Sequence, residues 1–100
     1  MPDAYRIRIT PRALADLEEV FKFIKRDSLQ NAPDMIRRLV DAIDSLEILP
    51  HRYDVPRTGR GLGRQVRSMA VRPHLVRYRI DERVKAVFIL RVRHGARRWL

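Results

Sequence analysis

The longest apolar run in the chain, Ala86–Leu90, places the strongest single constraint on its fold. Five apolar residues in succession favour a central strand, covered on both faces, over an exposed edge strand. The run passes into the alternation Arg91-Val92-Arg93 and stops at His94-Gly95. The sequence therefore predicts a strand that is apolar at its start and cationic at its end, with His94 where the chain leaves the sheet.

Regular alternation along this strand divides its side chains between the two faces of the sheet. One set is wholly apolar and consists of Phe88, Leu90 and Val92. The other set begins apolar and becomes cationic, and it consists of Val87, Ile89, Arg91 and Arg93. We expect the wholly apolar set to face the core.

The length of 100 residues predicts one domain, residues 1–100, with a single core. The chain has no cysteine, which excludes a disulfide framework and a thiolate metal site. No apolar run approaches the roughly 18 residues of a membrane span, and nothing resembles a signal peptide. We expect a cytoplasmic protein without a cofactor.

The charge is distributed unevenly along the chain. Residues 1–50 hold 8 Lys/Arg and 9 Asp/Glu, whereas residues 51–100 hold 14 Lys/Arg and 3 Asp/Glu. Nineteen of the 22 cations are arginine, which suits bidentate recognition of phosphate or carboxylate but is also typical of a GC-rich genome. The asymmetry predicts a nucleic acid, a nucleic-acid-bound complex or an acidic protein as partner.

The first half of the chain predicts a strand followed by two helices. Tyr5–Ile9 alternates as a strand, and Thr10-Pro11 is a strong helix start, with the helix continuing to about Arg26. A second helix begins best with Asn31 as its cap and stops before Pro50. Phe23 lies off the apolar stripe of the first helix, where it either widens the buried face or serves a partner.

The second half predicts a long loop over residues 50–63 and then three strands, Gln65–Val71, Leu75–Ile80 and the apolar strand described above. The fold class is therefore α+β, with the order β-α-α-β-β-β. An N-terminal strand and a helical hairpin would pack with an antiparallel sheet that ends in a three-stranded meander, the helices covering one face.

The face of this sheet turned away from the helices would be strongly basic. Its expected arginines are Arg6, Arg8, Arg67, Arg77, Arg79, Arg91 and Arg93, with Val87 and Ile89 in the middle. Such a face either is a solvated surface that resists edge pairing or binds an anionic partner.

No strong catalytic motif is present. The histidines at 51, 74 and 94 have no spacing typical of a metal pair, so we expect no metal site. Acid–base cleavage of RNA needs a proton donor, a proton acceptor and cations. The residues that could supply them are Tyr78, Tyr53, His94, Arg67, Arg77 and Arg91. Alternatively, Tyr78 belongs to the core, His94 is a polar strand end and the arginines are ordinary surface residues.

Four segments in order resemble the RelE/ParE superfamily of bacterial toxins from type II toxin–antitoxin pairs. YRIRITPRALADLEEV from Tyr5 is similar to the first strand and helix of that superfamily, and RLVDAIDSL from Arg38 to its second helix. HLVRYRID from His74 resembles its third strand, and ILRVRHGAR from Ile89 resembles the ParE-type ending. The resemblance covers nearly the whole chain.

The resemblance implies the β-α-α-β-β-β fold and a cognate acidic, ParD-like antitoxin whose helical tail lies along the toxin. It also implies one of two targets. ParE-like members poison DNA gyrase and so block replication, whereas RelE-like members cut mRNA in the ribosome. This chain has no lysine between residues 26 and 84 and no tyrosine after Tyr78, in contrast to RelE-like enzymes, which favours gyrase. On that interpretation the chain is a binding module rather than an enzyme.

Two sets of contact residues are predicted. The residues expected to bind the target are Arg77, Arg91, Arg93, His94, Arg97 and Trp99. Trp99 either anchors the target or packs the tail against the domain. The residues expected to bind the antitoxin are Phe23, Arg6, Arg8, Arg79 and Arg91.

Overall fold

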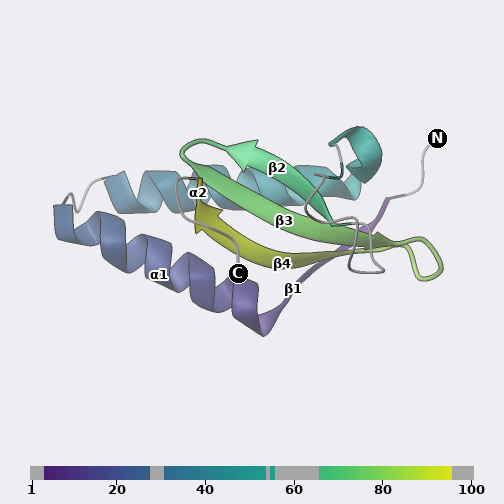
Figure 1. Ribbon diagram of the computed structural model, residues 1–100, viewed down its shortest axis with the longest axis horizontal. Helices are drawn as coiled ribbons and strands as arrows, with labels where there is room; N and C mark the ends of the chain where they lie inside the picture. Colours follow the sequence, from purple (N-terminus) through teal and green to yellow (C-terminus); the bar gives the residue numbers. More distant parts are fainter. Residues whose placement is uncertain (1–3, 28–30, 54, 56–65, 96–100) are drawn as a thin grey trace.

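The computed structural model describes residues 4–27, 31–53, 55 and 66–95 (Figure 1). Its elements are β1 (Arg6–Ile9), α1 (Pro11–Asp27), α2 (Asn31–Asp44), the short 3₁₀ helices η1 (Ser45–Glu47) and η2 (Pro50–Arg52), β2 (Arg67–Val71), β3 (His74–Asp81) and β4 (Ala86–His94). The expected α+β class and the order β-α-α-β-β-β are confirmed. No helix in the described part of the chain is long and apolar enough to cross a membrane.

The four strands form one sheet in the order β1-β4-β3-β2, so β4 is a central strand as expected. The expected meander is present, because β2 pairs antiparallel with β3 and β3 antiparallel with β4. The sheet is not wholly antiparallel, however, since β1 pairs parallel with β4. Parallel neighbours require a long crossover connection, and here the chain from α1 to the end of β3 lies between the two strands.

The first helix begins as the Thr10-Pro11 pair predicts. The Thr10 side-chain oxygen accepts a hydrogen bond from the backbone N–H of Ala13 at 3.2 Å. The same hydroxyl donates to the carbonyl of Ile89 at 2.7 Å, so this cap also joins the helix start to β4. The second helix begins at Asn31, which places Pro33 in its first turn, where proline is tolerated. Figure 1 shows α2 behind the sheet and α1 beside β4.

The core lies between the helices and one face of the sheet, and β4 contributes to it differently from the prediction. Val87 and Ile89 are fully buried, whereas Phe88 is only half-buried. The reason is a one-residue shift in register, since Tyr78 lies opposite Ile89 but Arg77 lies opposite Arg91. Leu90 is the extra residue. Strict alternation would have exposed Val87 and Ile89 or buried Arg91, and the shift avoids both costs.

A polar cluster ties the β3–β4 turn to the start of β1. The Tyr5 hydroxyl donates to Glu82 at 2.8 Å, and Lys85 Nζ lies 2.9 Å from the same carboxylate. His51 Nε2 lies 2.9 Å from Glu82 as well. The hydrogen bond from Lys85 lowers the pKa of Glu82, and the hydrogen bond to Glu82 raises the pKa of Tyr5. These groups are exposed to solvent, so the cluster orients the turn more than it stabilises the fold.

Candidate functional site

The end of β4 lacks a neighbouring strand on one side. The last paired residues of β1 and β4 are Ile9 and Ile89, and β4 continues for five more residues to His94. The Thr10 backbone N–H donates to the Ile89 carbonyl at 3.1 Å, and the chain then turns into α1. In the sheet formed by the described strands, Leu90–His94 therefore has an open outer edge, and α1 runs beside it (Figure 1).

Asp16 of α1 takes the place of that missing neighbour. Its carboxylate accepts hydrogen bonds from Arg91 Nε at 2.8 Å and from the backbone N–H of Val92 at 2.9 Å. The exposed fractions are 20% for the Arg91 side chain and 13% for the Asp16 side chain, so solvent screens this pair only partly. Asp16 thus fixes both the direction of Arg91 and the packing of α1 against β4.

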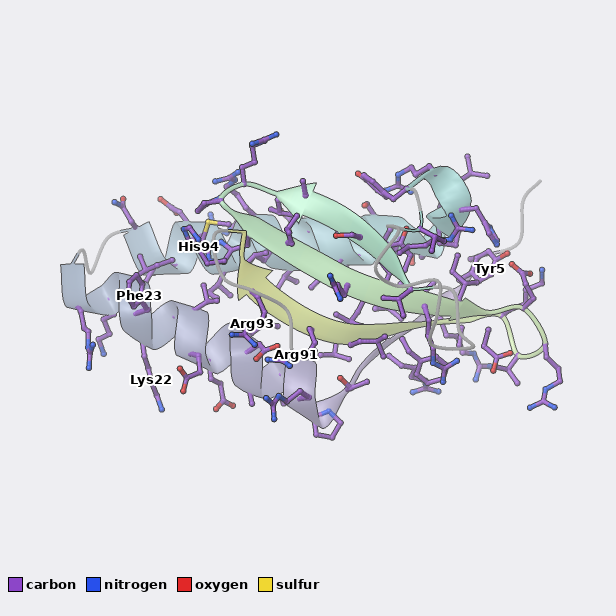
Figure 2. The ribbon with its side chains drawn as sticks, viewed as in Figure 1. Tyr5, Lys22, Phe23, Arg91, Arg93 and His94 are labelled. Atoms are coloured by element: carbon purple, nitrogen blue, oxygen red, sulfur yellow. The ribbon has the colours of Figure 1, made fainter. Side chains whose placement is uncertain are left out.

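A groove of about 580 Å³ lies between α1 and the end of β4. Figure 2 shows Arg91 and Arg93 between these two elements, with His94 at the end of β4 and Phe23 on α1. The residues that line the groove are Arg12, Ala15, Asp16, Glu19, Val20, Phe23, His74, Arg91, Val92, Arg93 and His94. The groove therefore combines a carboxylate-bearing helix wall with a cationic strand wall.

A second hollow of about 340 Å³ shares Phe23, His74 and His94 with the groove and continues between the two helices. Ile24, Met35 and Pro73 contribute apolar surface to it, and Asp34 and Arg38 are among its polar residues. The Phe23 side chain, which is 53% exposed, stands where the two hollows meet. Of the two roles considered for Phe23, exposure for a partner fits this position better than a widened core.

His74 and His94 meet across β3 and β4, with ring centroids 5.7 Å apart and the rings nearly perpendicular. His74 is buried and His94 is half-buried. The register shift creates this pair, because without the extra residue in β4 His74 would lie opposite Arg93. The spacing of the histidines did not predict it. No group of three possible metal ligands occurs among the described residues.

Tyr78, a candidate acid–base group for RNA cleavage, belongs to the core. Its side chain is fully buried, and its hydroxyl donates to the Pro50 carbonyl at 2.5 Å. Burial raises the pKa of Tyr78 to about 12. The group therefore stays protonated near neutral pH and lies in the core, which is the alternative considered for Tyr78.

Arg67 was expected on the open face of the sheet, and this expectation is wrong. It lies opposite Tyr78, so it shares the helix-covered side. Its guanidinium donates to the carbonyls of Tyr53 at 2.6 Å and His51 at 3.3 Å. Arg67 therefore secures the segment after η2 and is separated from Arg77 and Arg91, which face the other side.

The open face, defined here as the strand positions turned away from the helices, still carries most of the expected arginines. They are Arg6, Arg8, Arg77, Arg79, Arg91 and Arg93. Phe88, and not Val87 or Ile89, lies in the middle, with the Arg79 guanidinium carbon 4.3 Å from its ring centroid. Burial lowers the pKa of Arg77, which nevertheless remains a cation.

The predicted contact residues fall on two adjoining surfaces. Phe23, Arg91, Arg93 and His94 line the groove, and Arg6, Arg8, Arg77 and Arg79 lie on the open face, to which Arg91 and Arg93 also belong. Arg97 and Trp99 lie outside the described residues. Asp16 and His74 were not predicted as site residues. Asp16 lies off the apolar stripe of its helix, so the sequence does not distinguish it from a solvated carboxylate. The position of His74 opposite His94 depends on a register shift, which the alternation of residues does not reveal.

Comparison with known proteins identifies relatives of this chain. Residues 7–99 match the family model of the ParE toxin of the type II toxin–antitoxin system parDE. A protein from Sinorhizobium fredii described as "Putative toxin Y4kP" is 33% identical over 94 residues, which cover 94% of this chain and 92% of that protein.

Solved structures share the fold. A chain of the chromosomal ParDE system from P. aeruginosa has a TM-score of 0.74 at 20% identity and covers 91% of this chain and 96% of its own. A chain of the RelBE2 toxin–antitoxin complex from Mycobacterium tuberculosis has a TM-score of 0.61 at 26% identity, with 95% of both chains covered. The family match spans nearly the whole sequence. The chain belongs to the ParE toxin family of type II toxin–antitoxin systems.

Proposed function

We propose that this toxin acts by binding DNA gyrase, that it blocks replication, and that an acidic, ParD-like antitoxin neutralises it. Gyrase as the target rests on the resemblance of the chain to ParE-like toxins. In this proposal the toxin is not itself an enzyme, because it stabilises one state of another enzyme by differential affinity. The alternative is a RelE-like endonuclease that cuts mRNA in the ribosome.

One observation favours gyrase binding over mRNA cleavage: the groups that RNA cleavage would need lie apart from one another. Tyr78 is buried with a pKa of about 12, and Arg67 is held by backbone carbonyls on the helix-covered side. Arg91 is paired with Asp16. General acid–base catalysis requires donor and acceptor within hydrogen-bond reach of one substrate. Binding makes no such demand, so this arrangement supports a binding module.

The groove between α1 and β4 is the proposed antitoxin site. Structural relatives from ParDE and RelBE systems form toxin–antitoxin complexes, and we extend a protein antitoxin to this chain. Phe23 offers an exposed aromatic anchor, and the strand wall offers Arg91 and Arg93 to antitoxin carboxylates. An antitoxin seated there would cover the arginines that we assign to the target.

The proposed target-binding surface is the end of β4. Arg91, Arg93 and His94 lie together there, and Arg77 is opposite Arg91 on β3. Arg97 and Trp99 follow in the sequence and belong to the same proposed set. Arginine and tryptophan are the residue types that most often dominate binding energy at protein interfaces.

The proposal is tested by incubating purified toxin with gyrase, plasmid DNA and ATP. We expect supercoiling to stop and linear DNA to accumulate after protease treatment, and we expect the antitoxin to prevent both effects. Unchanged supercoiling with folded toxin would contradict the proposal. An assay of mRNA cleavage in translating ribosomes would then test the alternative.

A double variant, His94→Ala with Arg97→Ala, tests the residue assignment. We expect it to abolish growth arrest while binding to the antitoxin survives, because the groove retains Phe23, Arg91 and Arg93. Lys22→Ala with Arg26→Ala, on the exposed surface of α1, is the control for charge removed elsewhere. Full toxicity of the folded His94/Arg97 variant would remove these residues from the target-binding surface.

A further inference from the structure

We propose that the open face of the sheet binds the phosphate backbone of duplex DNA, so that the toxin contacts the DNA held by its target as well as the target protein. This inference deepens the proposed function and rests on it for its biological setting. The face consists of three strands that each contribute two arginines: Arg6 and Arg8 of β1, Arg77 and Arg79 of β3, and Arg91 and Arg93 of β4.

Carboxylates are scarce on this face among the described residues. Asp81 is the one carboxylate at its strand positions, and one of its oxygens already accepts the backbone N–H of Arg83 at 3.1 Å. Asp16 pairs with Arg91 at the rim. Arg6 and Arg8 are exposed and form no ion pair with any described residue. An anionic partner is therefore the complement of this surface.

The spacing of the arginines suits a run of phosphates. Alternate residues on one strand are about 6.7 Å apart, and adjacent strands lie about 4.8 Å apart. Six arginines on three neighbouring strands therefore form a grid across the face, instead of one pocket for a single anion. Guanidinium groups bind phosphate oxygens in a bidentate manner, which strengthens each contact.

Arg79 is positioned for this role by an aromatic ring. Its guanidinium lies over Phe88 at 4.3 Å, and its Nε is buried without a hydrogen-bond partner among the described residues. The ring contact thus orients the cation without consuming it in an ion pair. A stacked guanidinium still presents its terminal N–H groups to a phosphate.

The same contact favours a duplex over a single strand. Proteins that bind single-stranded nucleic acids stack unpaired bases on exposed aromatic side chains. Phe88 is the one aromatic residue at the described strand positions of the open face, and Arg79 already covers it. The face therefore offers cations for a backbone but no free ring for a base.

An acidic protein is a poorer complement to this face. The exposed large apolar side chains in the described part of the chain are Ile9, Leu14, Phe23, Ile48, Leu49 and Val84. None of them occupies a strand position of the open face, whereas protein interfaces depend on such anchors. Protein–DNA interfaces are instead polar and strongly positive.

The test is fluorescence anisotropy of a short labelled DNA duplex titrated with the full-length toxin alone, at several salt concentrations. The variant Arg6→Ala/Arg8→Ala/Arg79→Ala is compared with the matched control Lys22→Ala/Arg26→Ala/Arg37→Ala, which removes the same charge from exposed helix positions. Each lost phosphate contact lowers the slope of log affinity against log salt by about 0.9. We expect the open-face variant to lose up to about three such contacts and the control to keep the wild-type slope.

Equal salt slopes for the open-face variant and the control would overturn the inference. Tighter binding of single-stranded RNA than of the duplex would overturn the assignment to duplex DNA. Because gyrase is absent from this titration, the two proposals fail separately. If the toxin inhibits gyrase but does not bind DNA, the proposed function stands and the DNA-binding role of the open face fails. If the toxin binds DNA but does not affect gyrase, the DNA-binding role stands and the proposed function fails.

Discussion

The two halves of β4 share one strand but have opposite environments. Ala86–Ile89 is paired with β1 on one side and β3 on the other, and Val87 and Ile89 are fully buried. Leu90–His94 is paired with β3 alone and faces the groove beside α1. The first half therefore belongs to the core, whereas the second half presents cations on a scaffold that the first half holds in place.

The division between the halves is set by the point at which β1 becomes α1. Pro11 has no backbone N–H and could not extend the pairing of β1, while Thr10 caps the helix and binds the Ile89 carbonyl. Asp16 then accepts a backbone hydrogen bond at the outer edge of β4, where no strand follows β1. One strand can therefore contribute its first half to the core and its second half to a binding surface when the neighbouring strand ends early.

The largest expected effect comes from Ile89→Ala in the buried half. Its fully buried side chain is lost from the core, so we expect the free energy of unfolding to fall by about 2–5 kcal/mol. Arg93→Ala in the other half should cost less, about 1 kcal/mol or below, because its side chain is only half-buried. Urea unfolding monitored by circular dichroism measures both. Similar losses would contradict the division of β4 into two halves.

Asp16→Ala tests the link between α1 and the open half. It leaves the Val92 N–H without its acceptor and Arg91 without its partner, which should cost about 1–3 kcal/mol. Glu19→Ala, about one helical turn further along α1, removes the same charge from an exposed position that makes neither of these bonds and is the control. If both variants lost equal stability, Asp16 would be an ordinary surface carboxylate.

Thr10→Ala tests the boundary itself. The substitution removes the helix cap and the hydrogen bond to Ile89, and we expect a loss of about 1 kcal/mol in the free energy of unfolding. Thr10→Ser keeps the hydroxyl and should retain most of the stability. An alanine variant as stable as the wild type would show that the cap does not set this boundary.

Tyr78→Phe is expected to change how stability depends on pH. Because burial raises the folded-state pKa to about 12 from an ordinary value of 10, the unfolded chain ionises first as pH rises. The stability that Tyr78 contributes is complete below pH 10 and is lost between pH 10 and 12. We expect the phenylalanine variant to lack this part of the alkaline decline. Parallel curves for both proteins would contradict the buried, protonated tyrosine.

The sequence predicted the parts of the fold that depend on local pattern. The Thr10-Pro11 start, the proline in the first turn of α2 and the meander all follow from capping, backbone restriction and short turns. The parallel pairing of β1 was missed, because pairing direction depends on the crossover and not on the strand's own residues.

The site was predicted less completely than the fold. Arg91, Arg93 and His94 were predicted together, since they follow one another along a strand. The register shift at Leu90 was not predicted. Burying Val87, Ile89 and Val92 on one face while the arginines stay on the other requires an extra residue in the strand. Contacts such as Asp16 with Val92 join residues distant in sequence, and no local pattern specifies them.

The most direct test of the whole account is the supercoiling assay with two variants whose stability is measured alongside. Arg93→Ala with His94→Ala should lose inhibition of gyrase while its free energy of unfolding changes by less than about 1 kcal/mol. Ile89→Val should lose about 0.5–1.5 kcal/mol of stability and still inhibit wherever it is folded. Full inhibition by the Arg93/His94 variant, or loss of inhibition by folded Ile89→Val, would contradict the assignment of function to the open half of β4.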